Sequence, residues 1–128
     1  MARKAREQLS EAELAVLRVL WDFGPQTVRG VMERFHERGR RVAYTTVLTF
    51  LVRLEQKGFA VSDKKVGPAF VYRAKASRES VVRTRVRALL DQLYDGAAAP
   101  LALQLIENER FTDEELSKLR KLIDELGG

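Results

Sequence analysis

The chain has 128 residues, of which 45% are hydrophobic, carries a formal net charge of +5 and contains no cysteine. This length is that of one domain, or of one small domain with an assembly segment, and the lack of cysteine excludes disulfides, thiolate metal sites and a cysteine nucleophile. No apolar run approaches the roughly 18 residues of a membrane span, and no apolar stretch follows the basic N-terminus, so we expect a cytoplasmic protein with no membrane partner.

Two helices are predicted in the first third of the chain. Ser10-Glu11-Ala12-Glu13 is a capping box, in which two side chains satisfy backbone N–H groups reciprocally, and Gly24-Pro25 ends the helix that it begins. A second helix fits residues 28–37, with Thr27 as its N-cap. The single histidine, His36, is interpreted as a surface residue at the end of this helix.

The helix predicted over residues 43–58 has two different faces. One face collects the apolar side chains that we expect in the core, Val47, Leu48, Phe50, Leu51 and Leu54. The opposite face, called the polar face below, consists of Thr45, Thr46, Thr49, Val52, Arg53 and Gln56. Threonine, arginine and glutamine reach phosphates and base edges when a helix lies in a DNA major groove, which favours a DNA-contacting role. The alternative is an amphipathic helix whose β-branched residues simply face water.

A basic hairpin is predicted after Lys57-Gly58, which ends the third helix. Residues 59–61 and 70–72 are rich in β-branched and aromatic side chains, and the segment between them contains Lys64 and Lys65. Three helices followed by a two-stranded hairpin predict a winged helix-turn-helix. In that fold the third helix enters the major groove, and the hairpin, or wing, contacts flanking DNA.

Three amphipathic helices are predicted in the remainder, over residues 78–94, over residues 101–106 and after the capping box Thr112-Asp113-Glu114-Glu115. About 50 residues in three helices without a sheet cannot bury all of their apolar surface. A second copy of the chain would cover it, and a two-fold dimer is the commonest such assembly. The residues predicted to form the dimer interface are Val82, Val86, Leu89, Leu90, Leu93, Leu101, Leu105, Leu116, Leu119, Leu122 and Ile123.

The positive charge is concentrated in the first part of the chain. Residues 1–76 contain 15 Lys and Arg against 8 Asp and Glu, net +7, whereas residues 77–128 contain 8 against 10, net −2. A small domain at +7 attracts polyanions, as nucleic-acid-binding domains do, and a solvated basic surface without a partner is the alternative. We therefore predict a mainly α chain, with a winged helix-turn-helix DNA-binding domain at residues 1–76 followed by a helical dimerisation domain at residues 77–128.

The sequence contains no pattern that is typical of an active site or a cofactor site. One histidine cannot form a multi-histidine metal site, and the glycines lack the spacing of a phosphate-binding loop. Paired carboxylates such as Asp113 and Glu114 stand at a helix start, where they complement the helix dipole. We therefore expect no enzymatic activity, no metal and no cofactor.

In the order and spacing of its motifs, the chain resembles the penicillinase-repressor family of bacterial transcriptional regulators, the BlaI/MecI type. The resemblance is carried by Leu9–Glu13 with Val19-Leu20-Trp21, by Thr45-Thr46-Val47 with Arg53-Leu54 and Lys57-Gly58-Phe59, and by the tail from Tyr94 through Leu116. It implies a winged helix domain followed by a helical dimerisation domain. The activity that it implies is repression at inverted-repeat operators, often in front of antibiotic-resistance or stress genes.

The resemblance also implies DNA-contacting positions, which fall here on Thr45, Thr46, Thr49, Phe50 and Arg53. Four of the five lie on the polar face. Phe50 lies at the edge of the apolar face, so packing is its first role and DNA contact its second.

Two departures from the family pattern bear on function. Ala43 stands where better-known members often have a serine N-cap for the third helix, which removes a phosphate contact. Gln104-Leu105 stands where the family's partner protease cuts between asparagine and phenylalanine, so release by a small-molecule inducer, or by another protease, becomes the alternative to cutting by a sensor protease. Related copper-responsive repressors bind metal through cysteines, which this chain lacks.

These observations together predict a homodimeric, sequence-specific DNA-binding repressor. Its DNA-contacting residues are predicted to be Arg40, Arg41, Tyr44, Thr45, Thr46, Thr49, Phe50, Arg53, Lys57, Lys64 and Lys65, with the Arg3-Lys4-Arg6 arm as a further candidate. The alternative is a winged-helix protein-interaction module that does not bind DNA.

Overall fold

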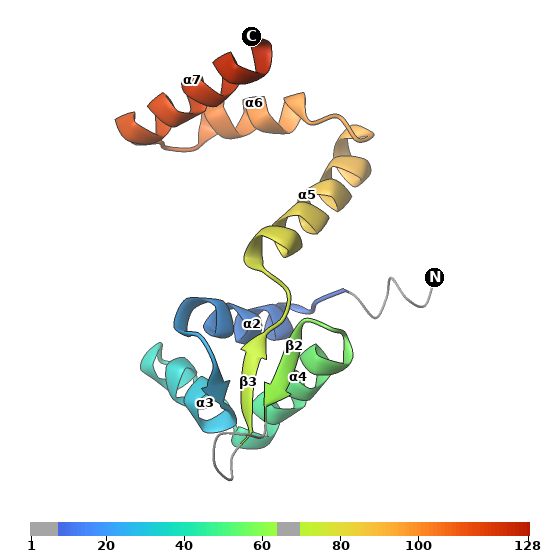
Figure 1. Cartoon of the computed structure of the whole chain (residues 1–128), viewed down its shortest axis with the longest axis vertical. Helices are drawn as coiled ribbons and strands as arrows, with labels where there is room; N and C mark the ends of the chain where they lie inside the picture. Colours follow the sequence, from blue (N-terminus) through green and yellow to red (C-terminus); the bar gives the residue numbers. More distant parts are fainter. Residues whose placement is uncertain (1–7, 64–69) are drawn as a thin grey trace. The chain divides into compact units, whose positions relative to one another are not determined.

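The computed structural model describes residues 8–63 and 70–128. The chain forms two compact units, Met1–Val82, called the head below, and Arg83–Gly128. Figure 1 shows their helices and strands in sequence colours. None of the described helices is long and apolar enough to cross a membrane.

The first two helices of the head begin and end where local signals place them. Helix α2 spans Glu11–Phe23, and its capping box is formed because the Ser10 hydroxyl accepts from the Glu13 N–H group at 3.1 Å and the Glu13 carboxylate accepts from the Ser10 N–H group at 2.9 Å. Helix α3 spans Val28–Glu37 behind the Thr27 cap. Both predicted helices are confirmed.

Helix α4 spans Tyr44–Gln56 and is also confirmed. Its apolar face is fully buried at Val47, Leu51 and Leu54, and it packs against α2, α3 and strand β2. The helix ends before Gly58, whose φ of +87° is in the left-handed region that glycine adopts without strain. The cap residue Ala43 makes no side-chain hydrogen bond, as its methyl side chain requires.

The predicted two-stranded hairpin is confirmed, and it belongs to a described sheet of three antiparallel strands in the order β1-β3-β2, of which one was not predicted. Strands β2 (Ala60–Asp63) and β3 (Val71–Ala74) begin one residue later than predicted and extend two residues further. The additional strand, β1 (Gln26–Thr27), pairs with β3 just before α3 begins. Two residues are too short to produce an alternating pattern, so only the pairing partner reveals β1.

The core of the head lies between α2, α3, α4 and the sheet. Its buried members are Val16, Leu17, Val19, Leu20, Val28, Val31, Phe35, Val47, Leu51, Leu54, Ala60, Tyr72 and Val81. Val81 belongs to the start of α5, so the first turn of that helix is part of this core.

The second unit is helical. Helix α5 spans Arg78–Tyr94, as predicted, α6 spans Ala99–Asn108 and α7 spans Asp113–Gly127. Helix α6 extends two residues beyond the predicted range at each end. Its start includes Pro100, which is tolerated in a first helical turn, where no N–H donor is needed. The capping box of α7 is formed between Thr112 and Glu115.

Candidate nucleic-acid interface

The polar face of α4 is an exposed surface. All six of its members are exposed, including the apolar Val52 at 37%. Tyr44 continues this surface at the start of the helix, where it is 46% exposed. The fold therefore brings these predicted residues onto one side of one helix, where hydroxyl, methyl, guanidinium and amide groups face outward together.

The threonine hydroxyls of this face are not equivalent. The Thr49 hydroxyl donates to the Thr45 carbonyl oxygen, one turn earlier, at 2.9 Å. A hydroxyl that donates within its own helix can still accept from a ligand, and its methyl group stays outside. Thr49 therefore offers a methyl group and an acceptor.

Three arginines of the predicted interface are exposed, and two of them lie near aromatic rings. The Arg53 guanidinium carbon is 6.0 Å from the centre of the Phe50 ring, and that of Arg40 is 5.3 Å from the centre of the Phe35 ring. Phe50 itself packs against the core, which fits the packing role expected first. In the described part of the chain, no carboxylate lies within ion-pair distance of Arg40, Arg41 or Arg53. Their positive charge remains available to an anion.

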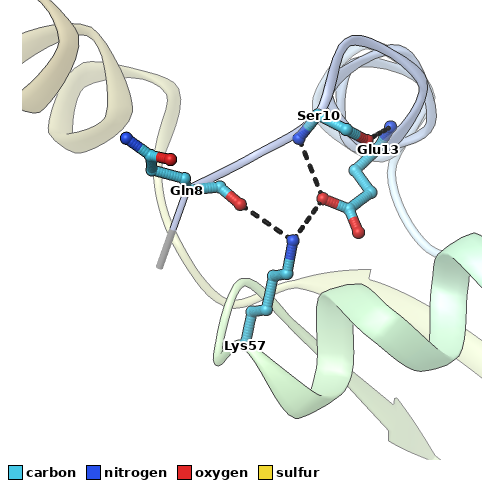
Figure 2. Close-up of polar contacts among 4 residues, drawn as sticks. All are labelled: Gln8, Ser10, Glu13 and Lys57. Atoms are coloured by element: carbon cyan, nitrogen blue, oxygen red, sulfur yellow. Dashed lines mark hydrogen bonds and ion pairs between the residues drawn. The ribbon is translucent and has the colours of Figure 1, made fainter. Parts of the chain in front are cut away.

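Lys57 is placed differently from the sequence-based expectation of a phosphate contact. Its Nζ atom lies 2.6 Å from the Glu13 Oε1 atom and donates to the Gln8 carbonyl oxygen at 2.8 Å (Figure 2). The side chain is only 22% exposed. Because the ammonium group is already bound inside the head, we leave Lys57 out of the proposed DNA contacts.

Sequence reasoning missed the second role of Glu13, which it assigned only to the capping box. Glu13 stands three and four residues before Val16 and Leu17, on the buried side of α2, and it is 2% exposed. Burial raises the pKa of this carboxyl, but hydrogen bonds from Lys57 and Ser10 outweigh burial and hold its pKa below the ordinary 4.5. A glutamate at helical spacing from the buried Val16 and Leu17 was the signal, because a buried carboxylate needs a positively charged partner inside the protein.

Two further polar contacts connect the elements of the head. The Glu55 carboxylate, near the end of α4, accepts from both the N–H group and the hydroxyl of Ser62 in β2, at 3.0 and 2.6 Å. Burial, followed by the negative charge of Glu55, raises the pKa of Tyr72 in the neighbouring strand. Helix α4 is thus connected to the sheet as well as to α2.

The end of α2 is connected to the start of α5. The Trp21 indole N–H donates to the Ala76 carbonyl oxygen at 2.9 Å, and the Arg78 guanidinium lies over the indole ring. Arg78 also pairs with Asp22, and this hydrogen bond is the main cause of the lowered pKa of the Asp22 carboxyl. Trp21 is therefore a structural residue of the head.

Several predicted contacts lie outside the described residues. These are Lys64 and Lys65 of the wing and the Arg3-Lys4-Arg6 arm. Within residues 8–63 and 70–128, no group of three or more His, Asp or Glu side chains is arranged to hold a metal ion.

Comparison with known families gives the class of protein. The family model described as penicillinase repressor matches residues 9–125. The chain belongs to the penicillinase repressor family. Members of the penicillinase repressor family are DNA-binding transcriptional repressors and not enzymes, which confirms the predicted family and class of protein.

Individual members show the extent of this similarity. The chain is 27% identical to the penicillinase repressor of Bacillus licheniformis over 118 residues, which cover 92% of this chain and 91% of that protein. It is 35% identical to the transcriptional regulator BlaI of Mycobacterium tuberculosis over 127 residues, 98% of this chain and 88% of that protein. The solved ferric uptake regulator of Vibrio cholerae matches with a TM-score of 0.51, at 14% identity, over 76% of this chain and 88% of that one, which shows a shared fold alone.

This penicillinase repressor family member also exposes much apolar surface in α5, α6 and α7. Of the predicted dimer residues, Val82, Val86, Leu89, Leu93, Leu105, Leu122 and Ile123 are exposed. Leu101, Leu116 and Leu119 are half-buried. Leu90 is buried within the chain itself at 4% exposure, so it supports the fold of the protomer.

Proposed function

We propose that this chain represses transcription by binding as a homodimer to an inverted-repeat operator. The observation that carries the proposal is the polar face of α4, because Thr45, Thr46, Thr49 and Arg53 face outward together from the third helix of a winged helix head. In helix-turn-helix proteins this helix enters the major groove. Base edges would then lie opposite the three threonines and the arginine.

The two kinds of side chain have different tasks in this proposal. Arg53 would donate two hydrogen bonds to a guanine, and the threonine methyl groups would contact thymine methyl groups, which gives sequence specificity. Arg40 and Arg41, in the turn before α4, would bind backbone phosphates together with Lys64 and Lys65 of the wing, which gives affinity on any sequence. Gln56 and Tyr44 extend the surface at the two ends of the helix.

Dimerisation would come from the apolar surface of α5, α6 and α7. A second copy of this chain presents the same apolar face, so an isologous interface covers both at once. Two heads on one dimer would bind half-sites about 10 base pairs apart, or a multiple of that distance, which is why an inverted repeat is expected. The dimerisation domain of this proposal begins after residue 76, so it includes the first turn of α5, where Val81 packs into the core of the head.

The relatives' names support a proposal for the biological setting. Proteins that match over more than 90% of this chain are named penicillinase repressor and methicillin resistance regulatory protein. We propose that the operator stands in front of resistance or stress genes and that the repressor acts in the bacterial cytoplasm, where the chromosome lies.

A binding selection from random DNA tests this proposal. The full chain is incubated with a library of random duplexes, the bound fraction is amplified over several rounds, and the selected sequence is measured by gel shift against a scrambled duplex. We expect an inverted repeat that binds at least about 10³-fold more tightly than the scrambled duplex.

Two control variants sharpen the selection. Arg53→Ala removes a cation from the polar face, and Arg120→Ala removes an exposed cation from α7. Only the first should lower the preference for the selected sequence. A wild-type chain that enriches no sequence would favour the alternative, a winged-helix module that binds protein.

A further inference from the structure

One carboxylate oxygen joins the two ends of a polar connection inside the head. Glu13 Oε1 accepts from the Ser10 N–H group at 2.9 Å, and it lies 2.6 Å from the Lys57 Nζ atom. Lys57 also donates to the Gln8 carbonyl oxygen at 2.8 Å (Figure 2). The cap of α2 and the residue that follows α4 are therefore attached to the same atom.

This pair is the exception in the core. Glu13 is the one buried charged side chain among the residues that the structure describes. Apolar residues of similar volume often stabilise a core as well as a buried ion pair does, because the pair loses its hydration. Net stability therefore does not account for an ion pair at this position.

An ion pair adds a preferred geometry, which apolar contacts lack. The apolar contacts of Leu51 and Leu54 with the core hold α4 against α2 but tolerate small rotations and shifts, because hydrophobic attraction has no preferred geometry. A 2.6 Å contact between two charged groups allows much less movement.

The placement of the pair along α4 matters as well. The cap residue at the start of the helix, Ala43, makes no side-chain hydrogen bond. The polar connections between α4 and other elements lie at its end, through Lys57 to α2 and through Glu55 to Ser62 of β2. Polar contacts at one end of a helix restrict its rotation about its axis. In a helix that lies in the major groove, that rotation decides which bases its exposed side chains meet.

We propose that Glu13 and Lys57 are positioning residues for operator recognition, whose ion pair holds α4 in the orientation that matches the polar face to the operator bases. The inference rests on the proposed DNA-binding function. Neither side chain contacts DNA in this arrangement. Their effect is on sequence preference, transmitted through α4.

Full-length variants test the inference. Lys57→Met and Glu13→Gln each break the ion pair, and the double variant leaves no unpaired buried charge. Lys75→Met is the matched control, because it removes one exposed charge from the same head. The quantity measured is the ratio of dissociation constants for a scrambled duplex and for the selected operator, at a temperature where circular dichroism shows every variant folded. We expect Lys57→Met to lower this ratio about tenfold, the effect of one misplaced base contact, and Lys75→Met to leave it unchanged.

The double variant separates positioning from folding. Its unfolding temperature should return toward the wild-type value, because no charge is stranded in the core, while the ratio stays about tenfold low because the directional contact is gone. A ratio that recovers together with the unfolding temperature would show a structural role only and would overturn the inference. Equal losses on both duplexes for Lys57→Met, with a shallower salt dependence, would mean that Lys57 binds phosphate, which overturns it too.

A measurement without DNA keeps this inference distinct from the proposed function. Amide hydrogen exchange in the last turn of α4 should be faster in the double variant than in the wild type, at equal global stability. Unchanged exchange overturns the positioning role whatever the chain does with DNA. Failure of the wild type to select any sequence, with exchange altered as expected, instead overturns the proposed function.

Discussion

The Thr49 hydroxyl donates to the Thr45 carbonyl oxygen at 2.9 Å, so its hydrogen is used inside α4. Bonds of this kind, from a threonine to the carbonyl four residues earlier, contribute little to helix stability. They do decide what the side chain presents to a ligand. In Thr49 the outward groups are a methyl group and the acceptor lone pairs of the hydroxyl oxygen.

We therefore predict that the Thr49 methyl group contributes more to operator affinity than its hydroxyl does. Thr49→Val keeps a methyl group in place and should change the free energy of binding to the operator by less than about 0.5 kcal/mol. Thr49→Ser removes the methyl group and should cost about 0.8 kcal/mol, the value of one buried carbon. Gel-shift titrations measure both. The reverse order would mean that the hydroxyl accepts a hydrogen bond from a base.

Truncation of Arg53 and truncation of Arg41 are predicted to change DNA binding in different ways. Arg53→Ala should cost about 1–3 kcal/mol on the selected operator and much less on a scrambled duplex, because it removes a base contact. Arg41→Ala should weaken binding to both duplexes alike, because it removes a phosphate contact. The slope of the logarithm of the binding constant against the logarithm of the salt concentration should become shallower by about one per head. Titrations at several salt concentrations measure both effects. If Arg53→Ala lost the same binding free energy on both duplexes, Arg53 would contact a phosphate and not a base.

Leu93 on α5 is predicted to be a dimer contact, because it is 65% exposed in the single chain. Leu93→Asp should weaken dimerisation by about two to four orders of magnitude, since each of the two copies loses a buried leucine worth about 1.5–3 kcal/mol. Operator affinity should fall with it, because a linked second head acts at an effective concentration around millimolar. Gln92→Asp, at the exposed neighbouring position, is the control. Analytical ultracentrifugation that shows an intact Leu93→Asp dimer would refute this assignment.

The stability of the head should depend on pH through Glu13. Its pKa is lowered in the folded chain, so the unfolded chain takes up the proton first as the pH falls. The contribution of the charged carboxylate to stability is therefore complete above the ordinary pKa of 4.5 and is lost as the pH falls through the lower folded value. The unfolding free energies of the wild type and Glu13→Gln, measured with urea, should differ most near about pH 6 and converge as the pH falls well below 4.5.

Glu33→Gln is the control for this pH dependence, because Glu33 is an exposed carboxylate in the middle of α3, in the same head. Its unfolding free energy should follow the wild-type curve across the whole pH range. A Glu13→Gln difference that stays constant with pH would show that the carboxylate charge does not contribute.

The peptide bond between Gln104 and Leu105 is predicted to resist a sensor protease of this family. It lies within α6, where the Gln104 carbonyl oxygen also accepts from the Asn108 side chain at 2.8 Å. Leucine and glutamine each mismatch a pocket shaped for phenylalanine and asparagine by about 1–3 kcal/mol, so cutting should be slower by about two to four decades. Mass spectrometry after co-expression with such a protease measures chain length. A fragment that ends at Gln104 within minutes would contradict this.

The helices of the head follow from the sequence alone. A capping box begins α2, a threonine cap begins α3 and Gly58 follows the end of α4, and each of these signals acts within a few residues. The helical periodicity of residues 43–58 also predicted that the polar face lies on the outside of α4. The family could also be inferred from motif order, since this order runs along most of the chain.

Only the tertiary structure decided which distant groups meet. Strand β1 exists because β3 lies beside it, and Lys57 is held in the head because folding brings Glu13 next to it. Leu90 resembled its exposed neighbours in sequence, yet the chain buries it. Periodicity states which side of an element is apolar, but the partner of a charge, a strand or an apolar side chain depends on residues far away in the sequence. Pairing of this kind has no local signal, because its free energy arises only when both partners are in place.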